Sequence, residues 1–238
     1  MTGFSSTLNS GVLVNLGDPD CDAAHKALLK ELQRLRVPFL DDSAALTNRQ
    51  KGNIGEFVTL HVARGLQFGA MEKQAGNALE PLSDISKAGL DLVYVYLDKS
   101  NALNDLIYIQ EIKTTAQKTL GYWEKLTEDY EKLFATDLDF TLQSRIQTLA
   151  FRFEIEQNND EYAERVKRLG ATTPQGCTNV RLLPTGIHDL SVGNPVEKLV
   201  AIQSAITVFG WNAAQIAPWA IGLSNLEERL LRLARGKL

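Results

Sequence analysis

The sequence is poor in the features that mark secreted, membrane and metal-cage proteins. Its 238 residues include only two cysteines, Cys21 and Cys177, and three histidines, with no CxxC motif and no His or Cys at zinc-ligand spacing. We therefore expect two free thiols in a reducing compartment. No run of about 18 apolar residues occurs, and the N-terminus lacks a basic leader followed by a long apolar stretch. These absences predict a cytoplasmic protein without a membrane anchor.

The chain also lacks an excess of positive charge and a phosphate-binding loop. A net charge of −4 argues against a protein that coats nucleic acid through bulk charge, but it leaves room for a local basic groove around an acidic site. No GxxxxGK[ST] motif occurs, so ATP-driven work would have to come from a partner. Hydrophobic residues at 44% and charged residues at 23% are ordinary globular values.

The apolar pattern divides the chain into three ranges that we expect to pack as one structural domain. Residues 1–48 hold an amphipathic helix in CDAAHKALLKELQRLRV, and residues 49–125 begin with a buried helix in KGNIGEFVTLHVARGL. Residues 126–238 are expected to be mainly helical, with a short strand in GCTNVRLLPTGIHD and a helix, or alternatively a strand, in VEKLVAIQSAITVFGW. The tail EQNNDEYAERVKR is expected to be a solvated helical face.

Two runs rich in Val, Ile, Leu and Tyr predict a β-hairpin. They are DLVYVYLD and DLIYIQEIKTT, joined by a turn-rich loop. Pairing Leu97 with Asp105 places Asp91 directly opposite Glu111, with the two Cβ atoms about 5 Å apart. Because side chains alternate along a strand, Lys113 lies on the same face as Glu111. The hairpin therefore gathers two carboxylates and an ammonium at one end.

Two carboxylates at this spacing repel each other, and a hard divalent cation would remove the conflict. Lys113 would then orient or deprotonate a metal-bound water, or steady the charge on a phosphoryl oxygen. On a helical wheel Glu56 lies away from the apolar stripe of its helix, beside small residues that would let that face approach the sheet.

Asp91 at the start of one strand, and Glu111-Ile112-Lys113 near the end of the next, resemble the signature of the PD-(D/E)XK phosphodiesterase superfamily, which includes restriction-type endonucleases. The resemblance covers roughly residues 50–120 and implies a restriction-endonuclease-like α/β core, a mixed central sheet flanked by helices. It implies that Asp91, Glu111 and the Ile112 carbonyl bind Mg²⁺ or Mn²⁺, that Lys113 acts on the water, and that Glu56 binds a second metal or its waters.

The sequence departs from the family pattern in two places. Leu90 stands where the motif has a proline, and no clear QxxxY element follows, which weakens an exonuclease interpretation. The function that the resemblance implies is metal-dependent endonuclease cleavage of phosphodiester bonds, in DNA more than in RNA. The proteins that commonly accompany this family suggest a role in anti-phage defence or restriction, with a helicase or sensor subunit as partner. A nuclease that cuts both strands usually needs two sites, so a homodimer is also expected.

Several residues beside the expected cleft are candidates for contacts to phosphates: Arg49, Lys51, Thr114, Thr115 and Lys118. Each taken singly is more typical of ordinary surface.

Alternatives stay open for the central residues as well. Glu111 and Lys113 could form a solvent-facing pair of little consequence, and Asp91 could cap a turn after Gly89. The same fold could also serve as a non-catalytic nucleic-acid-binding or assembly subunit, or the acidic hairpin could face a protein partner without any metal.

Overall fold

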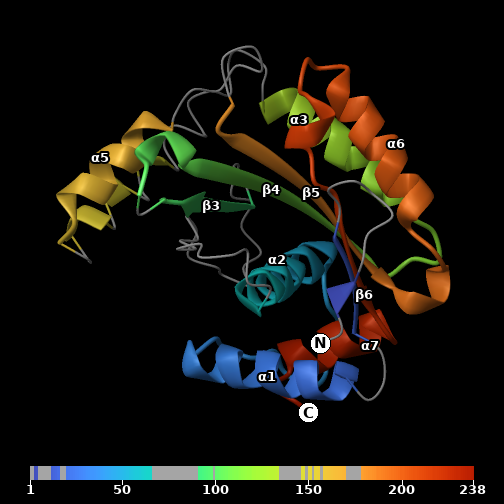
Figure 1. The fold of residues 1–238 in the computed structure, drawn as a ribbon. Coiled ribbons are helices and arrows are strands. Elements are labelled where there is room, and N and C mark those ends of the chain that lie inside the picture. The colour runs from blue at the N-terminus through green and yellow to red at the C-terminus, as the bar shows by residue number, and fades with distance from the viewer. Residues whose placement is uncertain are drawn as a thin grey trace.

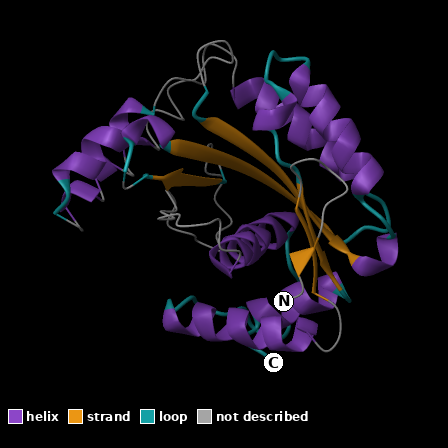
Figure 2. Cartoon of the chain, in the orientation of Figure 1, coloured by secondary structure: helices purple, strands orange, loops and turns teal. Residues whose placement is uncertain are grey.

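The structure is a computed structural model, and it describes residues 3–4, 12–16, 20–65, 91–98, 100–133, 146–147, 150–151, 153–155, 158–169 and 178–238. The strands are β1 (Gly3–Phe4), β2 (Val12–Leu16), β3 (Leu92–Tyr96), β4 (Leu106–Thr115), β5 (Val180–Asp189) and β6 (Trp219–Leu223). The helices are α1 (Asp20–Arg34), α2 (Asn48–Gly65), α3 (Lys125–Leu133), α5 (Asp160–Arg168), α6 (Val196–Thr207) and α7 (Leu226–Ala234). Figures 1 and 2 show these elements as an α/β arrangement, as the sequence predicted.

One mixed sheet forms the middle layer, with the strand order β1-β2-β6-β5-β4-β3. Strands β2, β6, β5 and β4 run parallel, whereas β1 and β3 are antiparallel to their neighbours. Helices α1, α2 and α7 share a buried apolar cluster with one face of the sheet, and α3, α5 and α6 share another with the opposite face. Two cores therefore cover both faces, which suits the nearly continuous apolar runs of the central strands.

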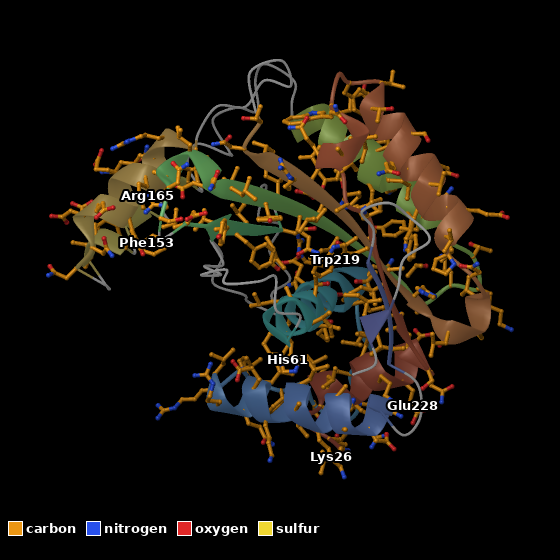
Figure 3. All side chains as sticks on the ribbon, in the orientation of Figure 1. Lys26, His61, Phe153, Arg165, Trp219 and Glu228 are labelled. Carbon is orange, nitrogen blue, oxygen red and sulfur yellow. The ribbon has the colours of Figure 1, made fainter. Side chains whose placement is uncertain are left out.

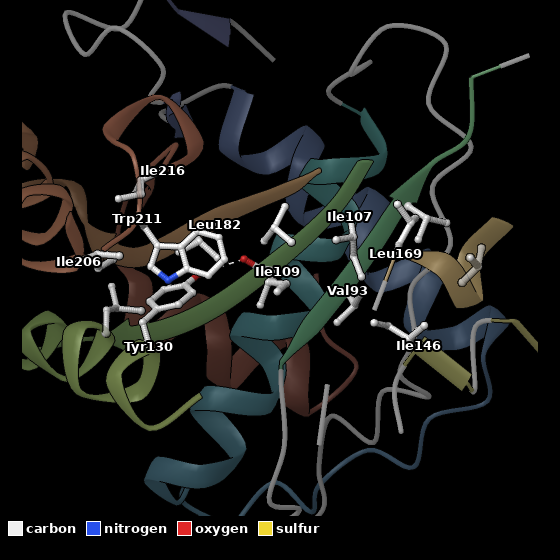
Figure 4. Packing of buried hydrophobic residues seen from close by; sticks show 14 of the residues in the cluster. Val93, Ile107, Ile109, Tyr130, Ile146, Leu169, Leu182, Ile206, Trp211 and Ile216 are labelled. Atoms are coloured by element: carbon white, nitrogen blue, oxygen red, sulfur yellow. Dashed lines mark hydrogen bonds between the residues drawn. The ribbon is translucent and has the colours of Figure 1, made fainter. Parts of the chain in front are cut away.

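The predicted hairpin is confirmed in its register. Val93 pairs with Ile109, and Val95 pairs with Ile107, in antiparallel β3 and β4. One face of β4 therefore carries Ile107 and Ile109 into the cluster with α3 and α6, while Ile112 belongs to the cluster with α1, α2 and α7. Figure 4 shows the first of these clusters, with Tyr130 from α3 over Ile109.

The C-terminal range needs a correction, because it supplies two strands to the sheet and does not only pack on the core. Its strands β5 and β6 occupy the middle of the sheet, and β5 pairs with β4 over nine residues, from Ile107–Val180 to Thr115–His188. Residues 180–189 include Pro184 and Gly186, and both residue types normally argue against a central strand. The sheet takes strands from all three of the ranges 1–48, 49–125 and 126–238.

The helices at 20–34, 48–65 and 196–207 confirm the helical patterns there, including the segment for which a strand had been the alternative. Helix α5 corrects the expected solvated face, because its Ala163, Arg165 and Val166 are buried. The mixed pattern at 67–87 lies outside the described residues. Among the helices that the structure describes, none is long and apolar enough to span a membrane.

Candidate active site

The hairpin register brings Asp91, which directly precedes β3, next to Glu111 in the second half of β4. One step beyond the Leu92–Gln110 pair, Asp91 lies opposite Glu111. The backbone N–H of Ile112 donates a hydrogen bond of 2.7 Å to Asp91 Oδ2. Asp91 is half-buried, whereas Glu111 is only 6% exposed. The predicted pair of carboxylates is therefore formed by the backbone pairing of two adjacent strands.

Burial is the largest cause that raises the pKa of Glu111 well above its ordinary value of 4.5, and the negative charge of Asp91 adds to it. The ammonium of Lys113 acts in the opposite direction, as does a hydrogen bond from the backbone of Asp91. A carboxylate in this position is poorly solvated and faces another carboxylate. It is stabilised either by a proton or by a cation.

Lys113 is placed as predicted, on the same face of β4 as Glu111, and it forms an ion pair with Asp129 on α3. Burial lowers the pKa of Lys113, but Asp91 and Asp129 outweigh it, so the net pKa is raised above 10.5. Lys113 is therefore held as an ammonium among carboxylates. Of the roles expected for it, this charge favours steadying negative charge over removing a proton from water.

Sequence reasoning missed two α3 residues that close over this end of the hairpin. Asp129 pairs with Lys113 and adds to the negative charge near Glu111. The Tyr130 hydroxyl accepts a 3.3 Å hydrogen bond from the Glu111 N–H and donates a 3.0 Å bond to the Ile109 carbonyl, and Figure 4 shows its ring beside Ile109. No local signal in LTEDYEK separates these residues from an ordinary polar helix face, because their partners lie on another element.

Glu56 is half-buried on α2, next to Gly55, and α2 packs on the face of the sheet opposite Glu111. The contact is close, because a Cβ at Gly55 would meet Thr114 Oγ1 at 1.9 Å. The close approach to β4 is made at Gly55, whereas Gly52, which the helical wheel placed beside Glu56, has nothing within 4 Å of where its Cβ would lie. The sheet separates α2 from the carboxylate pair, so Glu56 would have to reach the site around the end of β4. Its role as a metal ligand stays a prediction.

The oxygen atoms of this site suit a magnesium ion in chemical type. Two carboxylates and the Ile112 carbonyl are hard oxygen donors, and Mg²⁺ commonly keeps several waters beside one or two carboxylates. Among the described residues, no group of three or more His, Cys, Asp or Glu side chains is arranged as a metal cage. Asp91 and Glu111 would therefore hold a partly hydrated ion, with Glu56 or waters completing the coordination.

A polar pocket of about 270 Å³ lies at the C-terminal end of β4, where residues of α2 and α7, from the face of the sheet opposite Glu111, meet the end of the strand. The residues that line it include Asn48, Lys51, Thr114, Thr115, Tyr122 and Glu227. Three of the predicted phosphate contacts, Lys51, Thr114 and Thr115, are thus brought together. Arg49, which is half-buried, and Lys118, which is exposed, are not among the lining residues.

Comparison with known proteins adds no family to these observations. No protein-family model matches the chain, and a search of curated proteins likewise finds no match.

Proposed function

We propose that this protein is a metal-dependent nuclease of the PD-(D/E)XK type that hydrolyses phosphodiester bonds, in DNA more than in RNA. The observation that carries the proposal is the charge at the hairpin end. Asp91, Glu111 and Asp129 are gathered around the ammonium of Lys113, Asp129 also lies 3.8 Å from the Lys132 ammonium, and burial makes ionisation of Glu111 costly. A nearly buried carboxylate, Glu111, that faces a second carboxylate, Asp91, favours a bound cation and fits the residue types of the resemblance.

In this proposal each residue of the chain has a separate task. Asp91, Glu111 and the Ile112 carbonyl would hold Mg²⁺ or Mn²⁺, which when bound supplies Lewis-acid chemistry at a phosphoryl oxygen. Lys113 would stabilise the negative charge that develops on the phosphate, and Asp129 would position Lys113 through their ion pair. Tyr130 would fix the strand segment that carries Glu111.

The test is cleavage of supercoiled plasmid, linear duplex, single-stranded DNA and RNA in Mg²⁺, Mn²⁺ or EDTA. We expect cutting that needs a metal and that falls by about 100-fold or more in Lys113→Ala, because a preorganised charge in the transition state is lost. Lys132→Ala is the matched control, since Lys132 also lies beside Asp129, at 3.8 Å, but its side chain is 65% exposed. Equal activity in Lys113→Ala and wild type would refute the assigned site.

A second candidate function is favoured by the pairing of Lys113 with Asp129 and by the cover of Tyr130. These contacts also suit a nucleic-acid-binding or assembly subunit in which the charged cluster only holds α3 on the sheet. In that case wild-type protein would cut none of the four substrates with either metal, and Mg²⁺ titrated in a calorimeter would give no heat dependent on Asp91 or Glu111. The expected homodimer is tested separately, by light scattering with and without DNA.

A further inference from the structure

The pocket at the end of β4 combines an aromatic ring, a lysine and hydroxyl groups at the end of the strand that carries the proposed active site. Thr115 lies two residues beyond Lys113 and thus on the same face of β4, and it lines the pocket. Four residues separate Thr115 from Glu111, or about 13 Å of strand, which is the axial rise of about four stacked nucleotides. A strand that runs from the carboxylates along β4 and around its C-terminal end would therefore reach this pocket within a few nucleotides.

Tyr122 provides the aromatic surface. Its side chain is 42% exposed although it lies beside the fully buried Trp123. The Lys125 ammonium lies 5.1 Å from the centroid of the Tyr122 ring and brings positive charge to the pocket's rim. An exposed ring of this kind stacks on a base of any sequence, but only on a base that is not already stacked in a duplex.

Lys51 provides the phosphate-binding group. Its Nζ atom lies 2.5 Å from Glu227 Oε1, and the Glu227 side chain is 66% exposed. An ion pair with so exposed a partner contributes little to stability, so a phosphate can replace the Glu227 carboxylate at modest cost. Thr115 is nearly fully buried and its hydroxyl accepts a 3.2 Å hydrogen bond from the Gln117 N–H, so it forms part of the pocket wall.

We propose that this pocket binds one unstacked nucleotide of a single-stranded nucleic acid, with the base on Tyr122 and a phosphate on Lys51 in place of Glu227. The inference rests on the proposed nuclease function and names its substrate class: a single strand, or a duplex end whose last nucleotides are unpaired. The Tyr122 ring distinguishes this class from intact duplex, and Lys51 supplies affinity without reading sequence.

Binding is measured in EDTA, where no metal-dependent cleavage takes place, by fluorescence anisotropy of a labelled thymidine oligonucleotide of about 12 residues and of the corresponding duplex. We expect the single strand to bind more tightly. Tyr122→Ala should weaken single-strand binding by about 10-fold, the loss of one base–aromatic stack, while Tyr122→Phe, which keeps the ring, should bind like wild type.

The charge of the pocket is tested with the same oligonucleotide over a range of salt concentrations. Lys51→Ala should lower the slope of log K against log salt by about 0.7, the value for one phosphate contact on a single strand. Glu227→Gln should tighten binding, because Lys51 no longer has a competing carboxylate. Lys167→Ala is the control, since Lys167 lies on α5 in a comparable exposed pair with Glu164.

Equal binding of single strand and duplex, equal affinities for Tyr122→Ala and Tyr122→Phe, or no binding at all would overturn the inference. Because these measurements need no cleavage, they separate the two proposals. Loss of binding in the pocket variants without any nuclease activity would leave the pocket standing and refute the nuclease. Cleavage by wild type, together with unchanged binding in the pocket variants, would support the nuclease and refute the nucleotide pocket.

Discussion

The two ends of the β3–β4 hairpin both bury charge, but they balance it differently. At the loop end, the Asp105 carboxylate is 2% exposed and accepts hydrogen bonds from Arg165 Nε, at 2.9 Å, and from Arg165 Nη2. The Asp98 N–H also donates to Asp105, at 2.9 Å, and Arg165 Nη2 donates to the Asp98 carbonyl at 2.6 Å. Figure 3 shows Arg165 on α5, far from α7 and Glu228.

At the other end three carboxylates, those of Asp91, Glu111 and Asp129, are gathered around Lys113. At the loop end the buried Asp105 faces Arg165, which also lies 3.8 Å from the exposed Glu161, and the pair of Asp105 and Arg165 is joined by hydrogen bonds, as a structural ion pair requires. At the Glu111 end the charges are less evenly matched, because the nearly buried Glu111 faces a second carboxylate, Asp91. Buried charge by itself therefore says little about function, whereas buried charge of one sign in excess indicates a site that binds something.

The largest effect is expected from a substitution that breaks the Arg165–Asp105 pair at the loop end of the hairpin. Arg165→Met leaves Asp105 buried without its counter-charge, so we expect the free energy of unfolding to fall by about 3–5 kcal/mol. Urea denaturation measures this. Arg34→Met removes the exposed pair with Glu31 and should cost less than about 1 kcal/mol. A similar small loss for Arg165→Met would mean that the two hairpin ends do not differ in the way described.

Removing the Glu111 charge at the other end of the hairpin should instead raise the free energy of unfolding. The folded-state pKa of Glu111 is raised by burial and by Asp91. Between the unfolded pKa of about 4.5 and that raised value, the folded state binds more protons, so the free energy of unfolding falls as pH rises. Glu111→Gln removes this loss of stability at high pH, because glutamine does not ionise. The variant should be more stable than wild type at about pH 8 and should lose that advantage at about pH 4.

Urea titrations in EDTA at both pH values check the sign, with Glu128→Gln on the exposed side of α3 as the control. Destabilisation by Glu111→Gln at the higher pH would show that the Glu111 carboxylate is balanced, like Asp105, and would remove the main support for a cation site.

A smaller effect concerns the helix that packs beside the unbalanced end. Gly55→Ala would force Thr114 and α2 apart, since the new Cβ would meet Thr114 Oγ1 at 1.9 Å, and overpacking of this kind costs about 1–3 kcal/mol. Gly52→Ala, one helical turn earlier, meets nothing within 4 Å and should gain up to about 1 kcal/mol from helix propensity.

If Glu56 serves the site, Gly55→Ala should also reduce metal-dependent cleavage by more than its loss of stability explains, and Gly52→Ala should not. Plasmid cleavage at a temperature where both variants are fully folded makes that distinction. Unchanged cleavage in Gly55→Ala would place Glu56 outside the site.

Local patterning predicted the parts of this molecule whose partners are close in sequence. The hairpin was predicted in its register because its apolar residues alternate over two neighbouring runs, and Asp91 and Glu111 were placed opposite each other for the same reason. Helices α1 and α2 followed from their apolar stripes. In each case the information lies within one or two adjacent segments.

What the sequence did not reveal depends on contacts between distant segments. Arg165 looked like a solvated helix residue because its partner Asp105 lies 60 positions earlier. Asp129 gave no signal of its contact with Lys113 across two elements. Strand β5 was underestimated because Pro184 disfavours a central strand, yet Pro184 is the residue that pairs with Glu111 in the parallel register.

The order of the sheet has a consequence for how the molecule is made. Strand β2, from residues 12–16, pairs with β6, from residues 219–223, so the chain closes its sheet through a contact between segments some 200 residues apart. The β3–β4 hairpin needs only a short loop and forms fast, whereas contacts of such long range form slowly. During synthesis on the ribosome, the acidic hairpin therefore emerges well before β5, and the nascent protein exposes an unpaired β4 edge until residues 180–189 are released.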